Sequence, residues 1–208
     1  MLSFRARLAL VASAALLGLM YVLPVWRVTL AAPQYPEGLG MQIWLNTITG
    51  IKPNDLDNIN NLNHYIGMKR IVPESIPELR WMPVIVGVLA GLAAAAALTR
   101  NRKLATLFVV ALVGLAVIGL VDFYRWEYDY GHNLDLENAI IKIPGMSYQP
   151  PLIGSKQLLN FTASSWPAAG GFAAFGALVL GILALWIDRA PGARTGHRVR
   201  VPLSAAAA

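Results

Sequence analysis

Four long runs of hydrophobic residues alternate with polar segments along the 208-residue chain. Each run is close to the roughly 20 helical residues that cross the hydrocarbon core of a bilayer. The pattern therefore predicts an all-α fold, an integral-membrane four-helix bundle. The predicted spans cover about 8–28, 82–99, 104–124 and 167–187.

Between the spans lie two polar segments, at about 32–81 and 125–166. Four spans place both segments on the same side of the membrane, where we expect them to contain short interfacial helices. Residues 1–187 then form a single four-span membrane domain. The basic, alanine- and glycine-rich tail at 188–208 has little apolar bulk, and we expect it to be disordered and cytoplasmic.

The sequence predicts one helix within the first polar segment. Apolar residues from Leu56 to Ile66 recur at the spacing of a helix with one buried face, and Gly67 is a natural helix end. The glycine- and proline-rich stretch at 34–40 is predicted to be an ordered turn, not a strand.

Composition and charge support a membrane location. The chain is 56% hydrophobic and 13% charged, against roughly 25% charged residues in a typical soluble domain. Its basic clusters lie near residues 5–7, 100–103 and 189–200. Because Lys and Arg near span ends stay in the cytoplasm, we expect an inner-membrane protein with both termini cytoplasmic and the polar segments facing the periplasm. The net charge of +6 then fits the lipid bilayer as partner and requires no nucleic acid.

Several kinds of chemistry are disfavoured. The chain has no cysteine, which removes disulfide and thiol mechanisms. The apolar interiors of the four spans, at 8–25, 83–98, 104–121 and 168–187, contain no Asp, Glu, Lys, Arg or His. Transporters, proton pumps and membrane-embedded haem sites usually need such groups inside the membrane. No nucleophile, base and orienting group occur at a recognisable spacing, so we do not expect an enzyme.

Soft metal ligands are confined to the two polar segments. Imidazole and thioether ligands together suit Cu(I), which makes copper the predicted cofactor. The candidate ligands are His64, Met68, His132 and Met146. The alternative for these residues is ordinary packing of methionines on apolar surface and a histidine that only binds backbone carbonyls at a helix end.

Five stretches carry a family resemblance: 32–41, 58–69, 76–79, 128–134 and 143–161. They resemble a family of small four-span membrane proteins encoded among the accessory genes for nitrous-oxide reductase, near its copper chaperone lipoprotein. The resemblance covers about half of the chain and implies a copper-dependent setting. It implies no established site residues.

The resulting functional hypothesis is an inner-membrane accessory protein for a periplasmic copper enzyme of the nitrous-oxide reductase pathway. It would bind or relay Cu(I), or dock the copper chaperone lipoprotein or the reductase, on its outer face. Two alternatives remain open. One is a metal-free membrane anchor or scaffold for a partner protein, and the other is a quinol-linked electron-transfer component.

Overall fold

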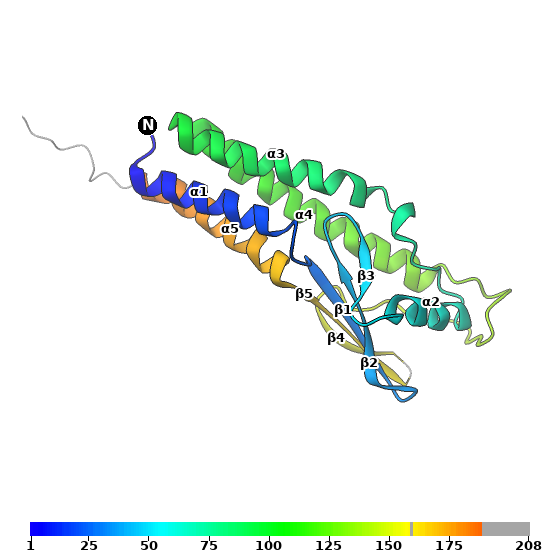
Figure 1. Cartoon of the computed structure of the whole chain (residues 1–208). Helices are drawn as coiled ribbons and strands as arrows, with labels where there is room; N and C mark the ends of the chain where they lie inside the picture. The colour runs from blue at the N-terminus through cyan, green and yellow to red at the C-terminus, as the bar shows by residue number, and fades with distance from the viewer. Residues whose placement is uncertain (159, 189–208) are drawn as a thin grey trace, which may run out of the picture.

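A computed structural model describes residues 1–158 and 160–188 as helices and an antiparallel sheet (Figure 1). This described part contains five α-helices, one 3₁₀ turn and five strands. The helices are α1 (Phe4–Leu19), α2 (Asp55–Tyr65), α3 (Glu78–Thr99), α4 (Arg102–His132) and α5 (Ala169–Ile187). The strands are β1 (Trp26–Ala32), β2 (Tyr35–Ile43), β3 (Ile48–Gly50), β4 (Gly154–Leu158) and β5 (Phe161–Pro167).

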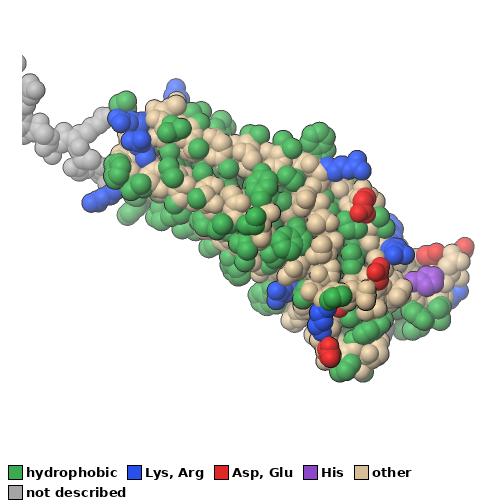
Figure 2. Space-filling model, in the orientation of Figure 1, with side chains coloured by type: hydrophobic (Ala, Val, Ile, Leu, Met, Phe, Trp, Pro, Cys, Tyr) green, Lys and Arg blue, Asp and Glu red, His purple; other side chains and the backbone are tan. Residues whose placement is uncertain are grey.

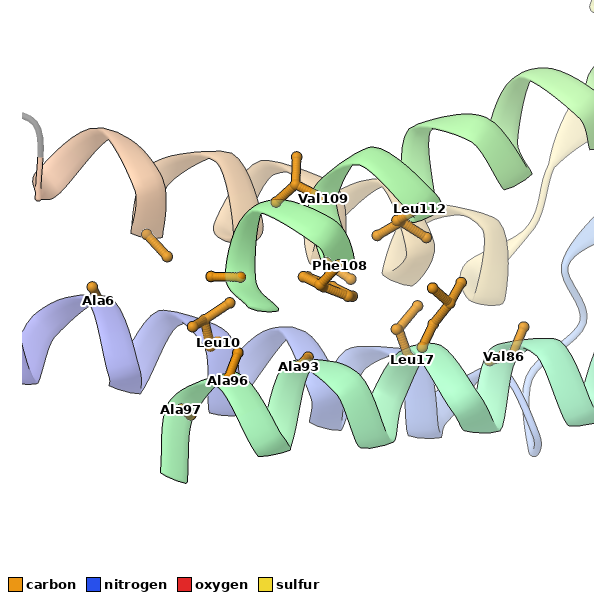
Figure 3. Close-up of a cluster of buried hydrophobic side chains, with 14 of the residues drawn as sticks. Ala6, Leu10, Leu17, Val86, Ala93, Ala96, Ala97, Phe108, Val109 and Leu112 are labelled. Atoms are coloured by element: carbon orange, nitrogen blue, oxygen red, sulfur yellow. The ribbon is translucent and has the colours of Figure 1, made fainter. Parts of the chain in front are cut away.

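Helices α1, α3, α4 and α5 pack side by side into an elongated bundle, with the sheet and α2 at one end (Figure 1). Its core combines a few large side chains, such as Leu10 and Phe108, with many alanines (Figure 3). Small residues allow close packing. Thus the buried Ser13 hydroxyl on α1 donates to the Ala177 carbonyl on α5 at 2.6 Å.

Among the described residues, three helices are long and apolar enough to cross a membrane: α3, α4 and α5. Large apolar side chains such as Val88, Ile118 and Phe172 point outward from them and are more than 60% exposed. Figure 2 shows hydrophobic side chains over the bundle and charged side chains at its two ends. An apolar belt between charged ends is typical of a multi-pass membrane protein.

The prediction of an all-α bundle of four spans is wrong, because the fold is mixed and has three long apolar helices. Helix α1 has 16 residues, about 24 Å in length, against a hydrocarbon core of about 30 Å. The predicted first span continued to residue 28, but the chain is already extended from Trp26. Pairing with two strands competes successfully with helix formation there, so the apolar run divides into a helix and a strand.

The sheet has the order β3-β2-β1-β5-β4, and all neighbouring strands are antiparallel. Strand β1 is central: Val28 pairs with Met41 of β2 on one side and with Ser165 of β5 on the other. The prediction of a turn at 34–40 is also wrong, since β2 runs through it. Gly40 permits this strand because a Cβ there would overlap the side chain of Ile51.

The predicted helix in the first polar segment is confirmed as α2, which packs on the sheet through Ile59. Its first residue, Asp55, is buried and accepts hydrogen bonds from the amides of Gly40 at 3.0 Å and Lys52 at 3.1 Å. Gly67, with φ of +79°, follows the helix end as expected. The predicted disordered tail at 188–208 lies, apart from Asp188, outside the described residues.

The two polar segments form one body. Strands β1 and β5 pair along their length, so residues before the first segment bond to the end of the second. Beyond the sheet, the Gly67 carbonyl accepts a hydrogen bond from the Asp135 amide at 2.8 Å, and the Tyr65 carbonyl accepts from the Ile141 amide at 2.8 Å. The segments therefore build a shared cap, whose described residues form a sheet and one α-helix of its own, α2.

Candidate functional site

An apolar cavity of about 1030 Å³ lies where the helical bundle meets the cap. Its walls come from the end of α1, from α3, α4 and α5, and from α2 and the strands. Ligand pockets usually measure about 300–1,000 Å³ and are mostly apolar, with a few polar groups. In size and lining, the cavity therefore has the character of a ligand site.

Aromatic rings form part of the wall nearest the cap. Trp26 meets Phe123 edge to face, with ring centroids 5.4 Å apart, and Trp126 lies 5.8 Å from Tyr130. The Tyr130 hydroxyl donates to a backbone carbonyl, which fixes the ring. The Trp26–Phe123 contact joins the sheet to α4, and the Trp126–Tyr130 pair lies within α4, at the level where the apolar part of the bundle ends.

Three carboxylates project into this apolar surface: Glu78 at the start of α3, and Asp122 and Glu127 in the last third of α4. Among the described residues that line the cavity, no Lys, Arg or His accompanies them. Asp122 experiences repulsion from Glu78 and attraction from the exposed Arg125. All the charged side chains in the described lining of the cavity are therefore acidic.

Glu127 is the most buried of the three, with 6% of its surface exposed. Neither of its carboxyl oxygens has a hydrogen-bond partner among the described residues. One helical turn later comes Gly131, where a Cβ would overlap the backbone of Gln149. The loop thus lies directly on α4 beside this turn, which helps to enclose the Glu127 side chain.

Tyr148 contributes a second buried polar group to the same cavity. It is 2% exposed, and its hydroxyl has no hydrogen-bond partner in the described part of the chain. Its amide donates to the Gly131 carbonyl at 2.9 Å, which holds the residue against α4. Burial raises the pKa of the phenol, so Tyr148 stays neutral at physiological pH and is available as a hydrogen-bond donor.

The four predicted copper ligands are placed differently. His64 is exposed in the last turn of α2, whereas Met68, beyond Gly67, is half-buried and lines the cavity. His132 is exposed at the end of α4, its ring stacked on that of Tyr128 at 4.0 Å and its Nδ1 3.1 Å from the Tyr128 carbonyl oxygen.

Met146 is half-buried in the loop before Tyr148 and does not line the cavity. Of the four described candidates, only Met68 does. Within residues 1–158 and 160–188, no three His, Asp or Glu side chains gather as a metal site would require. This search leaves out thioether ligands, so Cu(I) binding stays a prediction.

Sequence reasoning missed the cavity carboxylates. Asp122 and Glu127 were visible as acids within an aromatic stretch that directly follows an apolar run. Membrane interfaces commonly contain such stretches. The pattern alone therefore does not distinguish a carboxylate that lines a cavity from one that is exposed to solvent. The loop around Gln149, which lies on α4 one turn after Glu127, comes from a distant part of the second polar segment.

No family model, no curated protein and no solved structure matches the chain. The resemblance to the accessory family of nitrous-oxide reductase, and the pathway it implies, therefore stay predictions from the sequence.

Proposed function

We propose that this chain is a membrane-embedded binding protein whose cavity takes up the hydrocarbon part of one amphiphilic molecule. The observation that carries the proposal is the large apolar cavity at the junction of the membrane-spanning helices and the cap. Burial of hydrocarbon in such a space is favoured by about 25 cal/mol per Å² of apolar surface removed from water.

The rim of the cavity supports entry from the membrane. Leu120 on α4 and Phe175 on α5 line the cavity and are also 39% and 65% exposed at the surface of the apolar bundle. Residues shared by the cavity lining and the apolar surface support entry of a hydrocarbon chain from the surrounding lipid. A membrane amphiphile can therefore enter without passing through water.

The arrangement of basic residues supports an orientation. The Leu2 amide donates to the Arg100 carbonyl at 3.1 Å, and the Arg7 guanidinium donates to the Ala97 carbonyl at 2.8 Å. The N-terminus and the α3–α4 turn thus share the end of the bundle that is remote from the sheet (Figure 1). By the positive-inside tendency we place this end in the cytoplasm and the cap on the opposite side of the membrane.

Tryptophan fluorescence tests the binding proposal directly, because three tryptophans line the cavity and three are exposed. Trp26, Trp44 and Trp126 line it, and the other three are at 81, 166 and 186. A variant with Phe at the exposed positions, in a non-ionic detergent, is titrated with 9,10-dibromooctadecanol, whose bromines quench nearby indoles. We expect saturable quenching at about one probe per protein.

The control variant replaces Trp44 and Trp126 by Phe and keeps the exposed tryptophans. It should lose most of the saturable quenching and keep only a weak component that grows with the probe content of the micelle. Quenching that rises without saturation in both variants would show that the probe meets the protein only from the micelle, and would rule out the proposed cavity ligand.

A further inference from the structure

We infer that the amphiphile carries a cationic amine, and that Glu127, with Asp122 and Glu78, binds its ammonium group. The inference rests on the proposed function and adds the chemical class of the head group. It follows from three separate observations: an unpartnered buried carboxyl, the one-sided charge of the lining, and the position of the carboxyls relative to the apolar part of the cavity.

The first observation is Glu127 itself. Both its oxygens are buried and lack partners among the described residues, although a carboxylate accepts several hydrogen bonds. An isolated charge in apolar surroundings is strongly unfavourable unless a counter-charge or donors compensate it. A ligand with an ammonium group supplies both, because it carries a positive charge and three N–H donors.

The second observation is that the described lining of the cavity contains no basic counter-ion. The ion pairs of the described chain join other carboxylates, such as Asp129 to Lys69 and Asp57 to Arg70. No basic side chain reaches the cavity from its described walls. An anionic head group would meet three carboxylates here and a neutral one would leave them unpaired, whereas a cation is complementary to all of them.

The third observation is position. Asp122 and Glu127 lie beyond the apolar stretch of α4, and Glu78 begins α3, so all three lie at the level where the bundle part of the cavity meets its cap part. The apolar lining from α5 and from Leu112 and Leu115 extends away from them into the bundle. An amine with one long hydrocarbon chain matches this division.

Aromatic rings add to the recognition. In the sequence of α4, Trp126 lies between Asp122 and Glu127, the two acids of this helix that line the cavity. Its ring pairs with that of Tyr130 on the same cavity wall. A cation over an aromatic face is attracted by the electrons of the ring, and more strongly where water is excluded. Carboxylate and indole together therefore favour an ammonium group over a hydroxyl group.

The test compares three probes of equal chain length in the tryptophan assay: 9,10-dibromooctadecylamine, the corresponding alcohol and the corresponding carboxylic acid. The wild type should bind the amine about tenfold or more tighter than the alcohol, the ratio expected for charge-assisted hydrogen bonds. Glu127→Gln, which keeps the shape of the side chain, should reduce this ratio to near one by weakening the binding of the amine.

The exposed Glu137 provides the matched control, since Glu137→Gln removes one negative charge outside the cavity and should leave the ratio unchanged. If Glu127→Gln fails to fold, Glu78→Gln, at the half-buried start of α3, should lower the ratio in the same direction. Circular dichroism of each variant verifies the fold.

The outcomes separate the two claims. Saturable binding of the alcohol with no preference for the amine overturns the head-group inference and leaves the proposed function intact. A preference for the amine that survives both substitutions also overturns the assignment to these carboxylates. Absence of saturable quenching by any of the three probes overturns the proposed function itself.

Discussion

The backbone amide of Tyr148 donates a hydrogen bond to the carbonyl of Gly131 at 2.9 Å, which joins a loop to the last turn of α4. Because residue 131 has no side chain, the loop backbone lies directly on the helix. Glu127, one turn earlier on the same face, and Tyr148 thereby line the same cavity. A single close approach thus helps to enclose two of the three described side chains that have unpartnered buried polar atoms; the third is Glu78.

A side chain at position 131 should disturb this contact. A Cβ there would overlap the Gln149 backbone, so we expect Gly131→Ala to cost about 1–3 kcal/mol in stability through displacement of the loop. Thermal unfolding in detergent measures the loss. Gly114→Ala, in the same helix with nothing within 4 Å of the added Cβ, should be neutral or slightly stabilising. Equal effects of the two substitutions would contradict the close approach.

Partly filling the cavity should weaken ligand binding without unfolding the protein. Gly119 lines the cavity and has free space around the position of a Cβ. Gly119→Leu should therefore place its side chain in the cavity and lower binding of the brominated alcohol by about tenfold or more. Gly114→Leu is the matched control, because position 114 does not line the cavity. Unchanged binding in Gly119→Leu would contradict the assignment of the site.

The buried carboxylate at the start of α2 should hold the cap together. Asp55 is 3% exposed and accepts from the amides of Gly40 and Lys52. We expect Asp55→Ala to destabilise the protein by about 1.5–3 kcal/mol, since it leaves charge-assisted hydrogen bonds unmade. Asp57→Ala, at an exposed ion pair with Arg70, should cost at most about 1 kcal/mol. Chemical denaturation monitored by fluorescence compares the two.

The absence of cysteine makes the orientation easy to test. Single cysteines at Thr99, beside the basic α3–α4 turn, and at Glu37, an exposed cap residue, can be labelled in intact cells and in opened vesicles. A membrane-impermeant maleimide should label Glu37→Cys from the outside and Thr99→Cys only after the membrane is opened. The reverse pattern would contradict the proposed orientation.

The sequence-based copper hypothesis makes its own prediction. Titration of the purified protein with Cu(I) against a competing chelator should show uptake that is lost when His64 and Met68 are both replaced by Ala. Replacement of Met82, a cavity-lining thioether outside the predicted ligand set, serves as the control. A lack of uptake by the wild type would remove the basis of the hypothesis. The cavity proposal is independent of the result.

The helical part of the fold follows from local pattern. Predicted spans at 82–99 and 167–187 agree closely with α3 (Glu78–Thr99) and α5 (Ala169–Ile187), because an apolar run of that length has few alternatives to a helix. α4 was also predicted, but it continues to His132 because its polar end is stabilised by contacts with the cap.

The sheet was not predictable in the same way. The residues of β1 continue an apolar run, and those of β5 include Thr162, Ser164 and Ser165, which resemble a loop in sequence. Both segments are strands because they pair with each other, although they are far apart in the sequence. A prediction from the local sequence cannot detect such pairing. The cavity is lined in part by β1 and β5, so it also depends on that pairing. From the sequence alone, its acidic residues therefore look like the charged residues of an ordinary membrane interface.

The pairing of β1 with β5 also determines when the sheet can be completed during synthesis of the chain. The Trp26 indole donates to the Ser165 hydroxyl, and the two residues are 139 positions apart. At the usual ribosomal speed of about 5–20 residues per second, the edge of β1 that will receive β5 waits on the order of ten seconds for its partner. During synthesis the cavity therefore has no complete wall, and a ligand can be retained only once the fifth strand has emerged.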